Sequence, residues 1–271
     1  MFKTILSKDI FVNLYLRIFC RSKYQKFNKL LLNCGLKGLG INNYQNLFVS
    51  GELNFLKKYL LKIETPIIFD IGANKGDYAL TCKRINSKSK IFCFEPHPTT
   101  FTVLKTRIKD DNVVLINQAL SSSQGKFVLY DYAHKNGSSH ATLCNNIIEE
   151  IYKQTSTNVE VNVSTLDNFI ETQDLNKIDL LKIDVEGNEL KVLQGAIKTL
   201  NKGYINAIQF EFTQINSTSK VFMKDFFDLL KDKYEFYRLL SYGLLPLNQY
   251  SPIEHEIFGY QNIICLKKIK V

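Results

Sequence analysis

Polar residues able to bind or activate a small molecule recur at the ends of five apolar runs. Each run is short and almost continuously apolar, which is typical of a strand buried on both faces of a parallel sheet. The carboxyl ends of parallel strands meet at one edge, where open α/β sheets bind their ligands. Acids and amides at five successive strand ends therefore predict a single polar site. These residues are Asp70, Glu95, Asn117, Gln118, Asp184, Glu186 and Glu211.

The stretch IIFDIGANKGDYAL, residues 67–80, forms the end of the first predicted strand and the loop after it. Gly72 and Gly76 lack a Cβ atom, so the backbone can turn tightly and approach a ligand closely. The spacing differs from the G-x-G-x-x-G of dinucleotide-binding loops. Asp70 would repel a pyrophosphate but would suit a ligand with an ammonium group. Asn74 is either an amide contact to that ligand or a turn former, and both readings stay open.

Glu95 ends the second predicted strand, about twenty residues after this loop. An acid at that position can accept both hydroxyl hydrogens of a ribose. A ribose-binding acid beside a cation-binding acid, without a phosphate site, favours S-adenosylmethionine over a nicotinamide cofactor. That molecule combines a ribose and an adenine with a positive sulfur and an amino-acid tail.

S-adenosylmethionine is a methyl donor, and methyl transfer requires alignment of donor and acceptor and a group that takes the acceptor's proton. The candidate bases are Asp184, Glu186, Glu211 and His140. His140 lies in the polar loop NGSSHATL, either as a substrate contact or as an exposed loop histidine. His97, between two prolines, is interpreted as shaping its loop. We predict no bound metal; the alternative is a divalent cation held by the three carboxylates, since hard cations bind clustered carboxylates.

The elements that must position these residues alternate between strand and helix over residues 66–212. This alternation predicts a mostly parallel sheet with right-handed crossovers. The predicted strands are 66–71, 90–96, 112–120, 126–133, 158–169, 178–187 and 205–212, followed by 234–240 and 262–268. The predicted helices are 76–85, 98–109, 188–200 and 220–232.

Five segments resemble the FkbM family of S-adenosylmethionine-dependent methyltransferases in order and spacing. The resemblance begins at about residue 50, runs to the C-terminus and excludes roughly the first 45 residues. It implies a Rossmann-like class I methyltransferase fold, α/β with a mostly parallel central sheet and helices on both faces. It also implies S-adenosyl-L-methionine as cofactor and O-methylation of hydroxyls in carbohydrates or secondary metabolites. The segments are IFDIGANKGDYAL, IFCFEPHPTTFTVL, INQALS, VNVSTLDNFI and IDLLKIDVEGNELKVLQGA.

The resemblance also implies a role for each matching position. Glu95 would bind the ribose hydroxyls, and Asn117, Gln118 and Ala119 would border the adenine. Asp184 would lie beside the methionine end and the transferring methyl. The residues that would hold the methionine portion are Asp70, Gly72, Asn74 and Gly76.

The net charge of +9 lies entirely in residues 1–62, which hold eleven of the 35 Lys and Arg residues but two of the 26 Asp and Glu residues. Residues 63–271 are therefore neutral, which disfavours nucleic acid as a partner, since its binding needs a basic stripe along the working face. We interpret residues 1–62 as a basic, mostly helical extension and residues 63–271 as the methyltransferase domain. The extension either caps that domain or contacts an anionic membrane surface. No apolar run reaches the ~18 residues of a membrane span.

Six cysteines without a C-x-x-C pair argue against a zinc site and a disulfide framework. They predict a reducing, cytoplasmic location, with the inner membrane surface as a further option. The predicted function is O-methylation of a sugar, glycolipid or polysaccharide precursor. The alternatives are another small metabolite or a protein as acceptor, and a non-catalytic scaffold in a polysaccharide assembly complex. Neither the acceptor nor the oligomeric state follows from the sequence.

Overall fold

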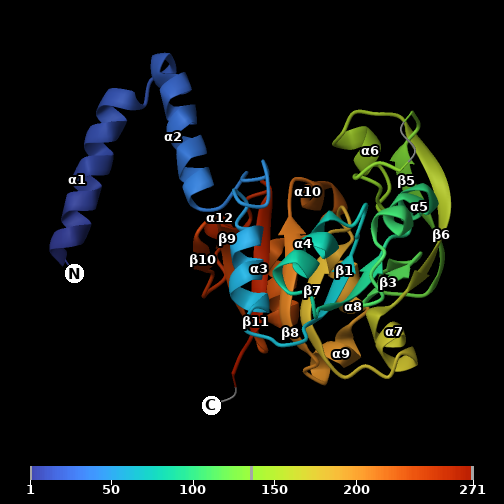
Figure 1. Cartoon of the computed structure of the whole chain (residues 1–271). Helices are drawn as coiled ribbons and strands as arrows, with labels where there is room; N and C mark the ends of the chain where they lie inside the picture. The colour runs from blue at the N-terminus through green and yellow to red at the C-terminus, as the bar shows by residue number, and fades with distance from the viewer. Residues whose placement is uncertain (1, 135–136, 270–271) are drawn as a thin grey trace.

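The computed structural model describes residues 2–134 and 137–269, which form strands and helices around two sheets (Figure 1). The strands are β1 (Ile67–Ile71), β2 (Lys90–Phe94), β3 (Val113–Ile116), β4 (Ala119–Leu120), β5 (Gly125–Tyr132), β6 (Ser156–Ser164), β7 (Ile178–Ile183), β8 (Ile205–Phe212), β9 (Tyr234–Leu240), β10 (Gly243–Pro246) and β11 (Gln261–Lys267). The helices are α1 (Phe2–Phe19), η1 (Ser22–Tyr24), α2 (Gln25–Gly38), α3 (Glu52–Leu60), α4 (Asp77–Ile85), α5 (Pro98–Arg107), α6 (Ile147–Glu150), α7 (Leu166–Thr172), α8 (Glu189–Gln194), α9 (Ile197–Asn201), α10 (Ile215–Ser219), α11 (Met223–Leu230) and α12 (Pro252–His255).

The larger sheet has eight strands in the order β10-β9-β11-β8-β7-β1-β2-β3. The pairs from β8 to β3 are parallel, whereas β11, β9 and β10 pair antiparallel. Ile68 of β1 lies opposite Ile91 of β2 and Leu180 of β7, which fixes the register at the centre. The predicted α/β architecture with a mostly parallel sheet is confirmed.

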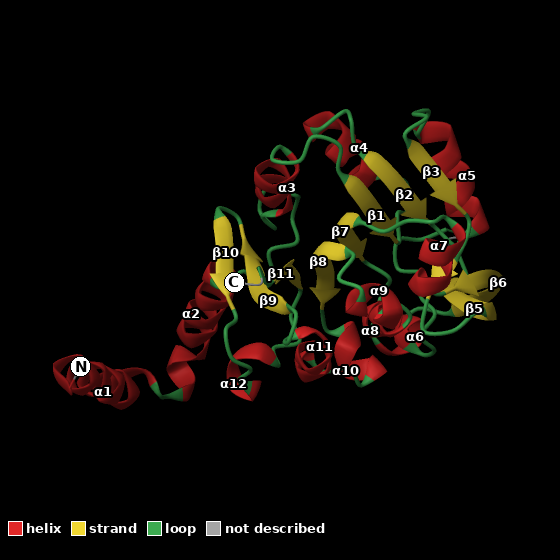
Figure 2. Ribbon diagram, turned by 90° about the horizontal axis from the view of Figure 1, so that it is seen from below, coloured by secondary structure: helices red, strands yellow, loops and turns green. Residues whose placement is uncertain are grey.

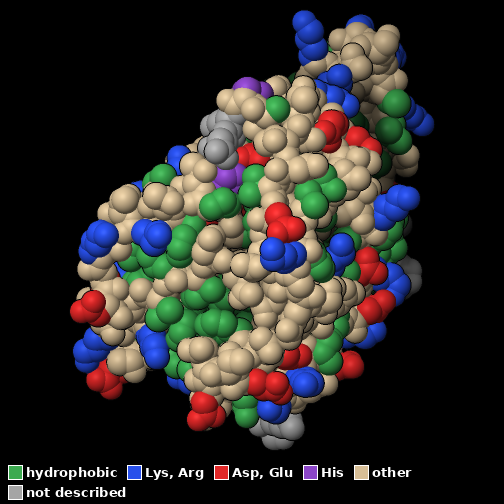
Figure 3. Space-filling view, turned by 90° about the vertical axis from the view of Figure 1, so that its right-hand side faces the viewer, with side chains coloured by type: hydrophobic (Ala, Val, Ile, Leu, Met, Phe, Trp, Pro, Cys, Tyr) green, Lys and Arg blue, Asp and Glu red, His purple; other side chains and the backbone are tan. Residues whose placement is uncertain are grey.

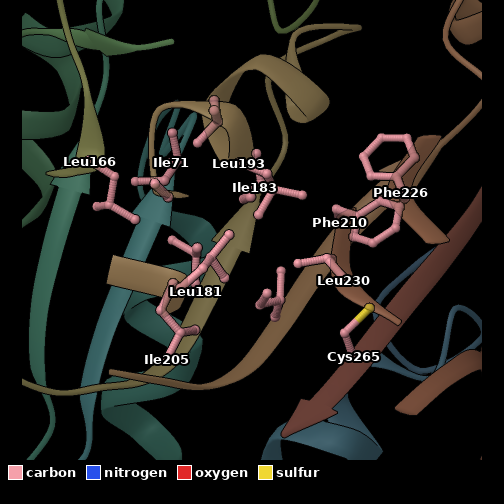
Figure 4. Packing of buried hydrophobic residues seen from close by; sticks show 14 of the residues in the cluster. Ile71, Leu166, Leu181, Ile183, Leu193, Ile205, Phe210, Phe226, Leu230 and Cys265 are labelled. Carbon is pink, nitrogen blue, oxygen red and sulfur yellow. The ribbon is translucent and has the colours of Figure 1, made fainter. Parts of the chain in front are cut away.

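Helices cover both faces of this sheet, with α3 and α4 on one side and α8, α9, α10 and α11 on the other (Figure 2). All six residues of β7 are buried, as a parallel strand covered on both faces requires. Helix α11 buries Met223, Phe226, Phe227 and Leu230, whose spacing places them on one helical face. Figure 4 shows two of these residues packed with Phe210 of β8 against the sheet.

Three predicted elements are divided or end earlier than the sequence pattern indicates. The strand predicted at 112–120 divides into β3 and β4, and β4 pairs with β6 in the second sheet. The strand predicted at 158–169 ends at Ser164, because the Thr165 side chain accepts a hydrogen bond from the Asn168 N–H and caps α7. The helix predicted at 188–200 breaks at Gly195, where an added Cβ would lie 2.0 Å from the Ser121 carbonyl oxygen.

The second sheet has three strands in the order β4-β6-β5, and lies beside the β3 edge of the larger sheet (Figure 1). Strands β5 and β6 were predicted as additional strands, and they form an antiparallel pair from Gly125–Val163 to Tyr132–Ser156. A bridge between Tyr130 and Thr142 joins the loop that follows β5 to this sheet. The second sheet therefore supports residues 138–143.

The N-terminal helices α1, α2 and α3 differ in how they pack against the rest of the protein. Helices α1 and α2 project away from the sheets (Figure 1), and every described side chain in both is at least partly exposed. Helix α3 instead packs into the core through Phe55, Leu56 and Leu60. The boundary predicted at residue 62 therefore falls after a helix that belongs to the body, and residues 2–38 do not cap the sheet. No helix among residues 2–134 and 137–269 has the length and apolar character to cross a bilayer.

Candidate active site

A cavity of about 230 Å³, the first cavity, opens at the carboxyl ends of β1, β2, β7 and β8. The chain proceeds from β1 to β2 and β3 on one side, and returns to β7 and β8 on the other. This reversal of strand order is where open α/β sheets bind ligands. The predicted site residues that line the first cavity are Gly72, Asn74, Glu95, Gln118, Ala119, His140, Asp184, Glu186 and Glu211.

Neighbouring protein atoms leave no room for a side chain at either glycine of the loop after β1. Gly72 has φ +83°, and an added Cβ would lie 1.8 Å from the Asp184 carbonyl oxygen. An added Cβ at Gly76, φ +86°, would approach side-chain atoms of Leu104 and Ile108 to 2.7 Å or less. Gly76 does not line the first cavity, so its role in the described structure is packing against α5. The G-x-x-x-G spacing is explained by two close contacts, that of Gly72 with the residue after β7 and that of Gly76 with α5 and its C-terminal end.

Asn74 has the conformation of a turn former, and its contact to a ligand stays a prediction. Its φ of 49° is left-handed, a conformation that asparagine adopts more readily than most residues. Its side chain lines the first cavity, and its Oδ1 atom is buried without a hydrogen-bond partner in the described structure. A buried polar atom of this kind calls for a partner, and a bound ligand can supply one.

Glu95 is held in a fixed orientation by two backbone amides. Its Oε2 accepts a hydrogen bond from the Asn74 N–H (2.9 Å), and its Oε1 accepts one from the His97 N–H (2.8 Å). Burial raises the pKa of Glu95 to about 7, although both amides favour the charged form. Asn117 does not line the cavity; its side chain donates to the carbonyl oxygens of Glu95 and Pro96, each at 2.9 Å. It therefore positions Glu95.

Asp70 lies beneath the β1 loop, fully buried and outside the residues that line the first cavity. Its Oδ1 is 3.2 Å from the Nζ of Lys182, the penultimate residue of β7. The same Nζ is 3.2 Å from Asp184 Oδ2 and 3.4 Å from the Gly72 carbonyl oxygen. The structure thus places a lysine of the protein at Asp70, where the sequence predicted a ligand's ammonium group.

Lys182 was not singled out in the sequence, although a lysine inside a buried apolar run is a signal in itself. Burial alone would lower its pKa, but the carboxylates of Asp184, Asp70 and Glu211 together raise it. The ammonium group is therefore charged at neutral pH. It links the ends of β1 and β7 electrostatically at the base of the first cavity.

Three carboxylates form what we call the acid cluster: Asp184, Glu186 and Glu211. Burial, followed by the charge of Asp184, raises the pKa of both Glu186 and Glu211. The hydroxyl of Tyr152 donates to Glu186 Oε2 at 3.1 Å. Within the described parts of the chain, no group of three or more His, Cys, Asp or Glu side chains is arranged to hold a metal ion.

His140 belongs to the site and is only partly exposed, unlike an ordinary loop histidine. Its ring stacks on Tyr152 with centroids 4.2 Å apart, and its Nδ1 is 2.5 Å from the Tyr132 hydroxyl. The sequence analysis did not identify either tyrosine, because Tyr132 and Tyr152 lie 8 and 12 residues from His140 in other segments of the chain. Tyr132 is the last residue of β5, and Tyr152 lies in the loop between α6 and β6.

His97 and Asp131 hold the loops around the site, as the sequence indicated for His97. His97 Nδ1 accepts a hydrogen bond from the Thr99 N–H and caps α5, while its Nε2 is 3.3 Å from Asp131 Oδ2. The same carboxylate oxygen accepts hydrogen bonds from the N–H groups of Gly137 (2.7 Å) and Ser138 (3.1 Å). The loop before His140 is thereby tied to the loop after β2.

The site lies within a region that matches a known family. Residues 70–239 match the family model described as Methyltransferase FkbM domain. The chain belongs to the FkbM methyltransferase family. The predicted family is confirmed, and with it the Rossmann-like class I methyltransferase fold.

Relatives of this FkbM chain carry related descriptions. It is 29% identical over 156 residues to Hexuronic acid methyltransferase AglP of Haloferax volcanii, covering 55% of this chain and 58% of AglP. It is 29% identical over 154 residues to 2-O-methyltransferase NoeI of Sinorhizobium fredii, covering 53% of this chain and 62% of NoeI. The match thus spans about three fifths of each relative. The solved FkbM methyltransferase of Methylobacillus flagellatus KT aligns with a TM-score of 0.45 and 11% identity, covering 88% of this chain and 60% of that one.

A second cavity, of about 660 Å³, adjoins the first in the FkbM chain. The two share His140, Glu186 and Glu211 as lining residues. Glu186 and Glu211 of the acid cluster therefore border both spaces, whereas Asp184 lines the first cavity. The other residues of the second cavity are Asn42, Tyr44, Tyr152, Thr213, Gln214, Ile215, Phe258, Gly259 and Tyr260.

Proposed function

We propose that this protein is an S-adenosylmethionine-dependent O-methyltransferase whose acceptor is a hydroxyl of a sugar, glycolipid or polysaccharide precursor. One observation carries the proposal: the cavity built around Glu95 adjoins a second cavity, and the two share His140, Glu186 and Glu211 as lining residues. The printed names of AglP and NoeI, a hexuronic acid methyltransferase and a 2-O-methyltransferase, support a sugar hydroxyl as acceptor.

The residues of the first cavity fit the cofactor. Glu95 keeps free lone pairs beyond the two amide bonds, which can accept the ribose hydroxyls. The unpaired Oδ1 of Asn74 can accept a hydrogen bond from the amino-acid tail. The apolar side chains of Leu129 and Leu143 line the same cavity and can cover the adenine together with Ala119.

When bound, S-adenosylmethionine would supply an electrophilic methyl group to the acceptor oxygen, and its sulfur would keep the electron pair of the broken carbon–sulfur bond. The chain must hold the acceptor in line and take its hydroxyl proton. Glu211 and Glu186 suit this role, because burial raises their pKa toward that of an effective base. His140 and Asp184 are the other candidates within the same cavity.

Isothermal titration calorimetry with S-adenosylmethionine and its demethylated product tests the cofactor. Transfer of a radiolabelled methyl group to a panel of glycosides then tests the reaction. We expect binding by the full chain and labelling of at least one glycoside. The absence of binding at millimolar cofactor would overturn the proposal, whereas binding without transfer to any glycoside, metabolite or protein fraction would favour the scaffold alternative.

The affinity for S-adenosylmethionine is expected to depend on pH through Glu95. A ribose diol donates hydrogen bonds, so it binds the ionised carboxylate, and the pKa of about 7 means that this form is lost in mild acid. The Kd should therefore rise about tenfold per pH unit below pH ~7 and level off above it. Titration from pH ~5.5 to ~8.5 measures this, and Glu95→Gln should flatten the profile. A wild-type Kd that is constant across the range would contradict the role of Glu95.

The raised pKa of Glu95 also makes the stability of the folded protein depend on pH. Between the ordinary value of 4.5 and about 7, folded Glu95 retains a proton that the unfolded chain has released. The contribution of Glu95 to the stability of the cofactor-free protein should therefore fall as pH rises through this window.

Glu211→Gln should identify the base. We expect kcat to fall about 10²–10⁴-fold, the usual range for loss of a general base, while the Kd for the cofactor changes little. Glu160→Gln is the matched control, because that side chain lies on β6 and is 64% exposed. A kcat equal to that of the control would transfer the role to Glu186 or His140, whose Gln variants complete the series.

A further inference from the structure

The lining of the second cavity combines aromatic rings with uncharged polar groups. Tyr44 and Tyr260 meet edge to face with centroids 6.1 Å apart, and Tyr44 is 66% exposed. Thr213 and Gln214 add a hydroxyl and an amide from the loop after β8. Aromatic faces pack against the apolar C–H faces of pyranose rings, while neutral hydroxyls and amides match their hydroxyl groups.

The titratable side chains of this cavity include two carboxyl groups, those of Glu186 and Glu211. Among the described residues that line the two cavities, there is no lysine or arginine. Glu186 and Glu211 line both spaces. Glu52 accepts a hydrogen bond from the Gln209 side chain at 2.8 Å and adds a further carboxyl that raises the pKa of Glu211. Lys182 is the nearby cation, but it already pairs with Asp70 and Asp184.

An acceptor with its own negative charge would find no lysine or arginine to pair with among the described residues that line the two cavities. A carboxylate or phosphate at a partly desolvated site is unfavourable unless a cation pairs with it. A neutral hexose avoids that cost, and its hydroxyls can donate to the acid cluster.

We propose that the second cavity binds a neutral sugar and discriminates against uronic acids and sugar phosphates. This inference rests on the proposed function and narrows its substrate class. It separates this chain from the relative named as a hexuronic acid methyltransferase. Tyr44, Tyr260 and Gln214 are the binding residues, and Glu186 and Glu211 are the source of the discrimination.

A matched pair of ligands tests the proposal: p-nitrophenyl glucoside and p-nitrophenyl glucuronide, which differ in one carboxylate. Saturation-transfer NMR with the full chain measures their binding without cofactor, and methyl transfer measures turnover. We expect the glucoside to bind at least about tenfold more tightly at low salt, with the difference shrinking as ionic strength rises. Equal or tighter binding of the glucuronide would overturn the proposal.

Three variants sharpen this test. Tyr44→Ala should weaken glucoside binding about tenfold or more, because it removes an exposed aromatic wall without disturbing the core. Gln214→Lys should improve glucuronide binding, because it adds a cation to the lining. Tyr242→Ala is the control, since that side chain is 75% exposed and outside both cavities.

The outcomes separate this proposal from the proposed function. If calorimetry shows no cofactor binding, the methyltransferase reading of the site fails. If the cofactor binds but Tyr44→Ala behaves like Tyr242→Ala, or Gln214→Lys leaves glucuronide binding unchanged, the cofactor site stands and the neutral-sugar assignment is overturned.

The projecting N-terminal helices carry an independent inference. Ile10, Phe11 and Leu14 of α1 and Leu30 and Leu32 of α2 are each between 56% and 70% exposed. Aromatic rings cluster where the two helices meet, with Phe19 5.2 Å from Tyr24 and 5.1 Å from Phe27 between centroids. Tyrosine is enriched where proteins meet the membrane interface, and so large an apolar surface marks an interaction site.

The charge of these helices indicates the partner. Basic residues alternate with the apolar ones at Arg17, Arg21, Lys23, Lys26 and Lys29, and Asp9 is the acid among residues 1–38. On the face of the body in Figure 3, by contrast, Lys and Arg are interspersed with Asp and Glu. An anionic bilayer attracts basic residues and accepts apolar ones, whereas a second copy of the same basic helices would be repelled.

We infer that residues 9–38 bind the surface of an anionic lipid bilayer. Cosedimentation of the full chain with vesicles tests this, using phosphatidylcholine alone and phosphatidylcholine with phosphatidylglycerol. We expect binding only to the mixed vesicles. The double variant Arg21→Glu/Lys23→Glu should abolish it, and Phe11→Ser/Leu14→Ser should weaken it at least about tenfold.

The control is Lys57→Glu/Lys58→Glu, which makes the same change of charge on exposed positions of α3. Equal binding to neutral vesicles, or equal loss in the control, would overturn the inference. So would a dimer in light scattering that Phe11→Ser/Leu14→Ser dissociates, if the wild type does not bind vesicles.

Discussion

Replacing Glu95 by alanine is expected to weaken S-adenosylmethionine binding by at least about 100-fold. The variant removes two hydrogen bonds from the ribose hydroxyls to a charged group, and each bond of that kind is worth about 1.5–3 kcal/mol. It also removes the acceptor of the Asn74 and His97 N–H groups, so both loops of the first cavity lose their common anchor. Isothermal titration calorimetry measures the Kd directly.

Two further variants show whether the loss of affinity in Glu95→Ala comes from the contacts of Glu95 itself. Glu95→Gln keeps an acceptor for one amide, so we expect a smaller loss of affinity together with the flattened pH profile. Glu160→Ala on β6 is exposed and should leave the Kd unchanged. If Glu95→Ala changes the Kd by less than about threefold with its circular dichroism intact, Glu95 does not bind the cofactor.

Replacing Lys182 by methionine is expected to lower the free energy of unfolding by about 3–5 kcal/mol. Methionine preserves the length and apolar stem of the side chain, but leaves Asp70 fully buried without its cation. Breaking a buried pair from one side has this cost because the remaining charge is uncompensated. Urea unfolding followed by circular dichroism measures the change.

Lys126→Met is the matched control, since the Lys126–Glu160 pair is 67% and 64% exposed and should contribute less than about 1 kcal/mol. The double variant Lys182→Met/Asp70→Asn should recover part of the loss, because it removes the unpaired charge. If Lys182→Met were no less stable than Lys126→Met, the pair beneath the β1 loop would have no structural role.

The strand ends were predictable because two regularities are local. A buried parallel strand is mostly apolar, so a polar residue directly after the apolar run indicates its end, as Glu95 does after β2 and Asp184 after β7. Parallel strands end at one edge, which is enough to bring these residues together. The same regularities do not predict an element broken by a distant contact, such as the helix interrupted where Gly195 meets Ser121.

The roles of single residues depended on partners that are far away in the sequence. Asp70 is the clearest case, because its partner Lys182 lies 112 positions further along the chain. The G-x-x-x-G spacing suggested close approach to a ligand, but the atom that Gly72 must admit is the carbonyl oxygen of Asp184. The spacing of glycines in a loop indicates that some atom approaches the backbone closely, but it does not identify that atom.

The sequence by itself determined the family, the parallel sheet and the polar edge where the first cavity lies, because these follow from apolar runs and from residues at their ends. Only the tertiary structure decided which acids face the cavity and which are paired inside. It also decided that residues 42, 44, 152, 213–215 and 258–260 line one cavity beside the acid cluster. These segments carry no common pattern, since a cavity is formed by packing between elements and not by the order of residues within any one of them.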